Sequence, residues 1–304
     1  MSSGFEVVLA GIQATIQDLG RVGLAGIGVS SAGALDEFAF HHANRLLGNE
    51  YGTNMLEIVF GGVKLKAKGS TSLVLTGAKV DATINNKPIE IWKTYKVNDG
   101  DIINLGYATS GARVYLGVKD GFSVEKEYGS CSVSIKEKLG GNPLHVKQFL
   151  PFKSVYLHDN RKLPTTYQPN YDKILMLRLV AGYQWDMFED IQRDKFFSSH
   201  YKVTGQNDRM GYRLSGEKIT STSKGIVSEP IAYGSVQIPA HGEPIVLLKE
   251  RQTIGGYPKI GSVIPVDCFR LAQAKQDSQV QFELISLEDA RDISIEFYKF
   301  FKEI

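Results

Sequence analysis

The chain reads Val63-Lys64-Leu65-Lys66-Ala67-Lys68, a strict alternation of apolar and lysine side chains. Successive side chains of a β-strand point to opposite faces, so this stretch predicts a strand with one buried face and one wet face. We therefore interpret the three lysines as the solvent side of a sheet and not as a nucleic-acid site. The formal net charge of only +2 supports that interpretation.

Further short strands surround this stretch in the first half of the chain. We predict strands at Phe5–Leu9, Ala14–Gln17, Met55–Phe60, Ser72–Leu75, Val80–Ile84, Ile89–Trp92, Ile102–Leu105 and Arg113–Val118. Asn85-Asn86 and Asp99-Gly100 are hairpin-type turns. One helix is predicted from about Asp36 to Leu47, with Gly48 as its stop. So many strands around one helix favour a sheet that closes into a barrel.

The second half repeats this plan after an irregular stretch that contains Gly140-Gly141 and several prolines. Helices are predicted at Met187–Phe197, at Val266–Ala274 and from Leu287, where Ser286 and Asp289 resemble a capping box. Further strands are predicted at Tyr201–Thr204, Ile226–Ser228, Gly234–Ile238, Ile245–Leu248 and Gln279–Ile285. The 304 residues are thus predicted to form a mainly β protein: a first domain at 1–125, an inter-domain crossing at 126–170, and a second domain at 171–304 with a C-terminal helix.

Composition excludes several classes of protein. Hydrophobic residues make up 42% and charged residues 22% of the chain, which is ordinary for a globular protein. The two cysteines, Cys131 and Cys268, stand in no paired motif, so neither a disulfide framework nor a zinc site is predicted. We expect no signal peptide, no membrane span and a cytoplasmic location. The sequence also lacks a P-loop for ATP, a nucleophile elbow and a His-Glu-x-x-His motif.

Two polar loops in the first half are candidates for function. Asp18 and Arg21 flank a glycine. They either form a local ion pair, or the Arg21 guanidinium binds a carboxylate or phosphate through two parallel N–H groups. In the loop from Ser31 to Asp36, Asp36 is expected to cap the helix. The alternative is an anion bound by backbone amides near Ser31 and Gly33.

Two more candidate loops lie in the second half. Asn207–Arg213 holds two arginines beside Asp208, which suits either a structural salt bridge or an anionic substrate. Glu250–Pro258 follows an apolar strand and contains Gly255-Gly256, which permits close backbone approach to a ligand.

Taken in order, these segments resemble a known family across nearly the whole chain. The matching stretches are Gln17–Arg21, Ser31–Asp36, Ala43–Asn49, Leu56-Glu57, Thr76–Ala78, Asp208–Leu214, Gly234–Pro239 and Arg251–Pro258. The family is the allophanate-hydrolase-subunit-2-like, or biotin-dependent-carboxyltransferase-like, family, which includes the C subunit of the bacterial ATP-dependent 5-oxoprolinase. The resemblance implies two cyclophilin-like β-barrel domains.

The resemblance also implies an activity shared with other chains. Together with its A and B subunits, a 5-oxoprolinase of this kind converts the lactam 5-oxoproline to glutamate, with ATP and Mg²⁺ acting at the level of the complex. Activating a lactam by phosphorylation requires cations and hydrogen-bond donors. The residues assigned on this basis are Asp208, Arg209, Arg251 and Gln252 as catalytic, and Arg21, Gln237, Thr253 and Tyr257 as substrate-binding. No metal ligand and no covalent biotin are assigned to this chain.

The sequence departs from the family pattern at several points. Cys131 and Val133 stand where an arginine and a threonine are expected, Asn142 replaces another arginine, and Glu250 replaces an aspartate. These changes leave two alternatives open. One is the carboxyltransferase component of a urea-carboxylase-like enzyme with a separate biotin carrier, and the other is a regulator that binds a kinase inhibitor similar to the B subunit.

Overall fold

A computed structural model describes residues 2–223 and 225–302 of the chain. The chain forms two compact units, one of Met1–Arg21 with Ala32–Tyr171 and the other of Val22–Ser31 with Asp172–Ile304. Residues 126–170 belong to the first unit, where Phe149–Pro151 (β9) pairs with a neighbouring strand. Strands dominate both units, so the predicted mainly β class with few helices is confirmed.

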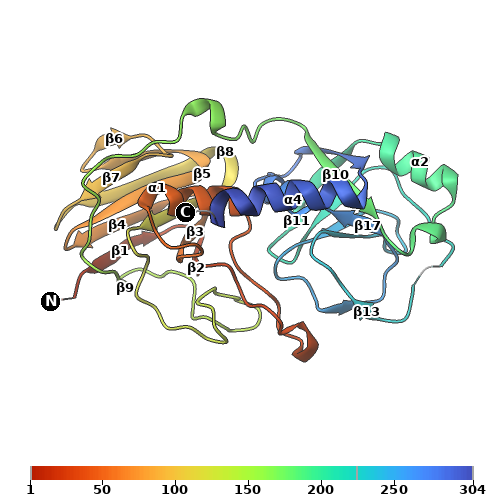
Figure 1. Cartoon of the computed structure of the whole chain (residues 1–304), viewed down its shortest axis with the longest axis horizontal. Helices are drawn as coiled ribbons and strands as arrows, with labels where there is room; N and C mark the ends of the chain where they lie inside the picture. The colour runs from red at the N-terminus through yellow and green to blue at the C-terminus, as the bar shows by residue number, and fades with distance from the viewer. Residues whose placement is uncertain (1, 224, 303–304) are drawn as a thin grey trace. The chain divides into compact units, whose positions relative to one another are not determined.

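The first unit is built on a curled sheet of nine strands, ordered β2-β3-β8-β4-β1-β9, with β5 paired to β8 and with β6 and β7 paired to β5 (Figure 1). The strands are β1 (Gly4–Ala10), β2 (Gln13–Gln17), β3 (Met55–Val59), β4 (Val63–Lys68), β5 (Thr71–Ile84), β6 (Lys87–Ile89), β7 (Thr94–Val97), β8 (Ile102–Val118) and β9.

Strand β4 shows why the lysine alternation is compatible with this sheet. Val63, Leu65 and Ala67 are fully buried, whereas the lysines between them are half-buried or exposed. β4 pairs with β1 on one side and with β8 on the other, so its apolar face contributes to the core that also contains Phe5 and Ile103. The prediction from residues 63–68 is confirmed.

Helix α1 (Glu37–Leu47) packs on β5 and β8, and the Thr76 hydroxyl of β5 donates to the carbonyl of Ala39 over 2.8 Å. The Asp36 carboxylate accepts a 3.1 Å hydrogen bond from the Ala39 amide, so Asp36 is the N-cap. Gly48 ends the helix in the left-handed conformation that glycine favours. Both predicted helix boundaries are confirmed.

Two long strands correct the strand boundaries expected in the first half. Ser72–Leu75 and Val80–Ile84 are parts of the single strand β5, and Ile102–Leu105 and Arg113–Val118 are parts of β8. The register of β5 against β8 shifts just after Gly77, where a Cβ atom would lie 2.3 Å from the carbonyl oxygen of Arg113. The glycine therefore marks a bulge inside one strand and not a strand end.

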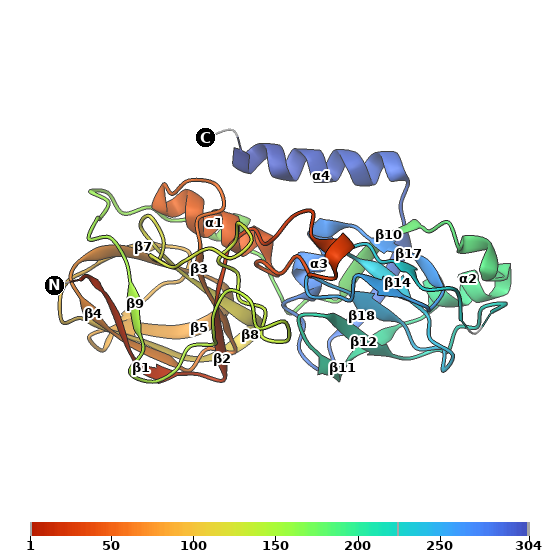
Figure 2. The same ribbon diagram turned by 90° about the horizontal axis from the view of Figure 1, so that it is seen from below.

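The second unit contains a closed barrel in the order β10-β17-β14-β15-β12-β11-β18 (Figure 2). Its strands are β10 (Leu175–Ala181), β11 (Tyr201–Asn207), β12 (Gly211–Ser215), β14 (Ser235–Gln237), β15 (Ile245–Leu247), β17 (Lys259–Val263) and β18 (Gln279–Leu284). β13 (Glu229–Pro230) and β16 (Ile254–Gly255) form a separate ribbon. The strand predicted at Ile226–Ser228 is wrong: the Ile226 amide donates to the Gly256 carbonyl over 2.9 Å, but the strand itself, β13, begins at Glu229.

Helices α2 (Asp190–Ser198), α3 (Pro265–Leu271) and α4 (Leu287–Lys302) complete the second unit, with short 3-10 turns such as η3 (Trp185–Met187). The capping box before α4 is confirmed, because Ser286 donates to the Asp289 carboxylate over 2.6 Å and accepts from the Asp289 amide over 3.0 Å. No helix in the described part of the chain combines the length and apolar character needed to cross a membrane.

Candidate functional site

The Asp18 carboxylate lies at the centre of a polar node in the first unit. It accepts hydrogen bonds from the hydroxyls of Ser130 (2.5 Å) and Ser132 (2.6 Å) and from the amides of Cys131 (2.9 Å) and Gly20 (2.8 Å). Burial alone would raise the pKa of Asp18, but these hydrogen bonds outweigh it and lower the pKa below its ordinary value. Asp18 therefore anchors the 130–132 loop as a carboxylate.

Arg21 does not pair with Asp18, so the local ion pair is not what holds this turn. Its side chain is 2% exposed, and its Nε donates to the carbonyl of Glu127 over 3.2 Å. Within residues 2–223 and 225–302, no atom accepts a hydrogen bond from its buried Nη1 or Nη2. Gly140 packs closely against this region, because a Cβ there would lie 2.1 Å from the Ser132 carbonyl oxygen and 3.0 Å from Arg21 Nη2. These two adjacent donors, Nη1 and Nη2, have the arrangement that binds both oxygens of a carboxylate or phosphate.

Cys131 lies at a position where the resemblance leads us to expect an arginine, and its thiol donates to the Asp18 carboxylate over 3.2 Å. Burial, the charge of Asp18 and this hydrogen bond raise the pKa of the thiol to about 12. The thiol is therefore protonated and inert at neutral pH. The loop keeps its attachment to Asp18 through backbone and serine contacts, without an arginine.

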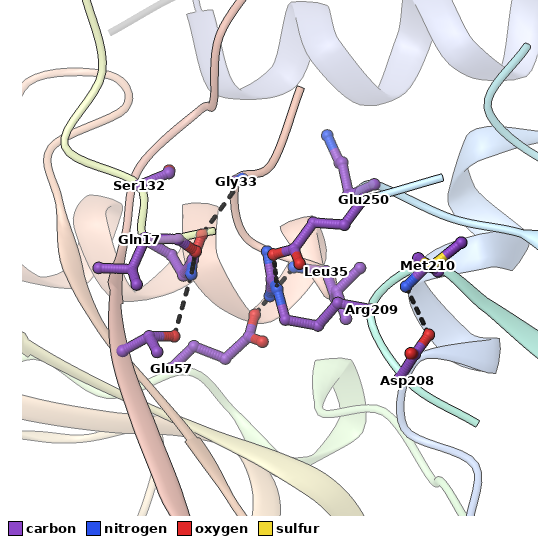
Figure 3. A network of polar contacts seen from close by, with 12 residues as sticks. Gln17, Gly33, Leu35, Glu57, Ser132, Asp208, Arg209, Met210 and Glu250 are labelled. Carbon is purple, nitrogen blue, oxygen red and sulfur yellow. Dashed lines mark hydrogen bonds and ion pairs between the residues drawn. The ribbon is translucent and has the colours of Figure 1, made fainter. Parts of the chain in front are cut away.

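Two buried side chains hold the segment that leads into α1, as Figure 3 shows. Gln17 accepts from the amide of Gly33 over 3.2 Å, and Glu57 accepts from the amide of Leu35 over 2.9 Å. Tyr115 also donates to Glu57, over 2.7 Å. Because these side chains already occupy the Gly33 and Leu35 amides, the alternative of an anion bound by free amides here is not supported.

In the second unit, Arg209 and Glu250 form a buried ion pair, visible in Figure 3. The amide of Glu250 also donates to the carbonyl of Arg209 over 2.9 Å. Asp208 is exposed, and its carboxylate accepts from the amides of Met210 (2.7 Å) and Gly211 (3.3 Å), as in an Asx turn. The structure thus brings the predicted Arg209 together with Glu250.

Arg251 contacts backbone carbonyls. Its Nε donates to Ile231 over 3.0 Å and its Nη1 to Leu248 over 3.2 Å. Burial lowers its pKa. Next to it, Gln252 is exposed and Thr253 is half-buried, and the predicted Tyr257 is 45% exposed. The catalytic and binding roles assigned to these four residues stay predictions.

Gln237 is the predicted residue with the most unusual surroundings in the second unit. It is 4% exposed, and among the described residues its buried Nε2 has no hydrogen-bond acceptor. It lies opposite Lys259 in the β14·β17 pairing. Lys259 in turn forms an ion pair with Glu229. Sequence reasoning missed Lys259 and Glu229, although Lys259 directly follows the matched stretch that ends at Pro258.

No group of three histidine, cysteine, aspartate or glutamate side chains in the described ranges is placed to hold a metal ion.

Comparison with known proteins places these sites in a family context. Residues 27–284 match the family described as "Carboxyltransferase domain, subdomain A and B". The chain is 32% identical to the C subunit of 5-oxoprolinase from Haemophilus influenzae, over 91% of this chain and 90% of that protein. It is 30% identical to the C subunit of 5-oxoprolinase from Escherichia coli, over 98% of this chain and 97% of that protein.

A solved structure shows the same fold inside a much longer chain. The K. lactis urea amidolyase superposes with a TM-score of 0.92 at 24% identity over 99% of this chain, which spans only 20% of that protein.

Proposed function

Because this chain belongs to the carboxyltransferase-domain family of subdomains A and B, we propose that it acts as the C subunit of an ATP-dependent 5-oxoprolinase. The observation that carries this proposal is the match to two 5-oxoprolinase C subunits along 90% and 97% of their lengths. On this proposal the chain works in the cytoplasm and binds a B-like subunit directly, and an A-like subunit completes the complex.

The chemistry of the reaction agrees with the donors found in each unit. A lactam carbonyl is a poor electrophile, and phosphorylating its oxygen makes it a good one. The paired Nη donors of Arg21 suit a carboxylate or a phosphate. Gln237 offers a neutral donor for a carbonyl oxygen. Since the chain has no P-loop, we assign ATP and its Mg²⁺ to the complex and not to a particular residue here.

Reconstitution tests the proposal. The chain is co-expressed with candidate A-like and B-like subunits, and glutamate release from 5-oxoproline is measured with and without ATP. We expect ATP-dependent turnover that disappears when this chain is omitted. Equal turnover without the chain would refute the proposal. Stable binding to the B-like candidate without any turnover would instead favour the regulatory alternative.

A second candidate function is supported by the urea amidolyase fold and by the family match. In that case the chain transfers a carboxyl group to or from biotin on a separate carrier protein. Incubating the chain with a carboxybiotin-loaded carrier and measuring loss of label in the presence of urea distinguishes this activity from lactam opening.

A further inference from the structure

The segment Val22–Val29, which we call the arm, exposes several apolar side chains to solvent. Val22 is 91% exposed and Ile27 is 68% exposed. Ala25 is also exposed, whereas Leu24 and Val29 are half-buried. Single exposed apolar side chains are common on proteins, so exposure alone does not identify a binding surface. Three further properties of the arm do.

The first property is Gly26, in the middle of the 3-10 turn η1 (Ala25–Ile27). Its φ lies outside the left-handed region, and a Cβ there would meet no described atom within 4 Å. Gly23 and Gly28 differ, since each has a φ of +82° that glycine favours. Neither conformation nor packing inside the chain therefore requires a glycine at 26, and glycine is unfavourable in a helical turn. The use that remains is close approach of another backbone.

The second property is the lack of charge. No side chain between Arg21 and Asp36 is charged, so the arm is neutral along its whole length. A charged group of a partner placed against the arm would lose its water without gaining a counter-charge. The complementary surface is therefore apolar and uncharged.

The third property is that the arm is already folded. The amides of Ile27 and Val29 donate to the Leu24 carbonyl over 3.1 Å and 3.3 Å. The Gly28 amide donates to the Ala25 carbonyl over 3.0 Å. A loop that is ordered before it binds loses less conformational entropy on binding, so the arm is prepared for a partner.

The two stretches that flank the arm are held together in the first unit. The amide of Ala34 donates to the Asp18 carbonyl over 3.0 Å. A Cβ on Gly33 would lie 2.8 Å from the Leu19 carbonyl oxygen, so the flanking backbones touch. Loops whose ends lie close together are Ω-loops, which are frequently functional. The arm is thus a preformed loop on a fixed base.

We propose that the arm inserts into an apolar, uncharged pocket of the B-like partner subunit. Val22 and Ile27 are the apolar anchors, and Gly26 is the point of closest backbone approach. Removing such side chains from water is the main favourable term in most protein association. This assignment rests on the proposed function, and it names the surface through which this chain binds its direct partner.

Titration calorimetry of the full chain against the candidate B-like subunit tests the proposal. We expect Ile27→Ser and Gly26→Gln each to weaken the affinity by at least about tenfold, the first by removing an anchor and the second by blocking close approach. Because a Cβ at 26 meets nothing in the described chain, Gly26→Gln should keep the wild-type melting temperature. Val227→Ser is the control. It replaces another apolar side chain of the second unit that is 91% exposed, and it should bind as the wild type does.

Three results would overturn the proposal. They are no binding by the wild type, unchanged affinity in either arm variant, and an equal loss of affinity in Val227→Ser. Sedimentation velocity on the chain alone examines a second copy as the occupant of the arm. Dimerisation that Gly26→Gln abolishes would assign the arm to self-association and would also reject the B-like subunit as its partner.

The outcome is separable from that of the proposed function. Binding of the B-like subunit that depends on the arm, combined with no glutamate release in the reconstituted complex, would reject the 5-oxoprolinase role and leave the interface. ATP-dependent turnover by a complex whose assembly is unaffected by both arm variants would reject the interface and leave the role.

Discussion

Arg209 and Glu250 lie on different loops of the second unit, yet their side chains form an ion pair in which each is less than a tenth exposed, at 7% and 6%. Removing one member leaves the other charge buried without its partner, which typically costs about 3–5 kcal/mol. We expect Arg209→Met to lower the free energy of unfolding by roughly that amount in urea denaturation. The double variant Arg209→Met/Glu250→Leu should recover part of the loss. A single variant within about 1 kcal/mol of the wild type would show that the pair is not structural.

Replacing Arg21 should affect activity strongly and stability little, in contrast to replacing Arg209. Among the residues that the structure describes, the Arg21 guanidinium makes one hydrogen bond, from Nε to the Glu127 carbonyl, so Arg21→Met should change the free energy of unfolding by no more than about 1 kcal/mol. In the reconstituted complex, kcat/KM for 5-oxoproline should fall about 100-fold, since a bidentate ionic contact is lost. Arg161→Met, at an exposed position of the same unit, serves as the control. Wild-type kinetics in Arg21→Met would remove Arg21 from the binding site.

The two cysteines should be unreactive in the folded protein. Burial raises the pKa of both thiols, with Asp18 contributing at Cys131 and Asp267 at Cys268. At pH 8 a thiol with a pKa near 12 is thiolate roughly a thousand times less often than an ordinary cysteine. We expect no fast modification by a thiol reagent in buffer and two modified cysteines in denaturant. A rapid reaction of one cysteine in the native state would contradict the Asp18–Cys131 contact.

His42 gives the protein a pH-dependent stability. Burial, followed by the charges of Arg45 and His41, lowers its pKa from 6.5 to about 4. As the pH falls from about 6.5 to 4, the unfolded chain therefore takes up a proton that the folded chain does not, and stability decreases by up to about 3 kcal/mol. His42→Gln should be destabilised less than the wild type between pH 7 and pH 4.5 in urea unfolding. His241→Gln, at an exposed site, should keep the wild-type pH dependence.

The features that could be predicted from the sequence are those that nearby residues determine. The alternation at 63–68 fixes which side of β4 is buried, and the Asp36 cap and the Gly48 stop fix α1 within one residue. The merged strands β5 and β8 were not predictable in the same way. A glycine such as Gly77 looks like a strand end until the position of the paired strand is known.

The candidate site shows the same limit. The spacing of Asp18 and Arg21 suggests a local pair, but the side chains that hydrogen-bond Asp18 are those of Ser130, Cys131 and Ser132, more than a hundred positions away. The contact between Glu229 and Lys259 spans 30 positions and depends on how the barrel places β17 next to β14. Contacts of this kind follow from tertiary packing, which no single stretch of sequence encodes.

The barrel of the second unit closes where β18 joins β10 in parallel, Leu175 opposite Val280, while its other edge takes up β11. A ribosome must therefore release nearly the whole unit before these last strands can pair, and a chain shortened before residue 279 would keep two unprotected strand edges. Such a nascent or truncated form would bind chaperones, and its unpaired strand edges would pair with those of other copies.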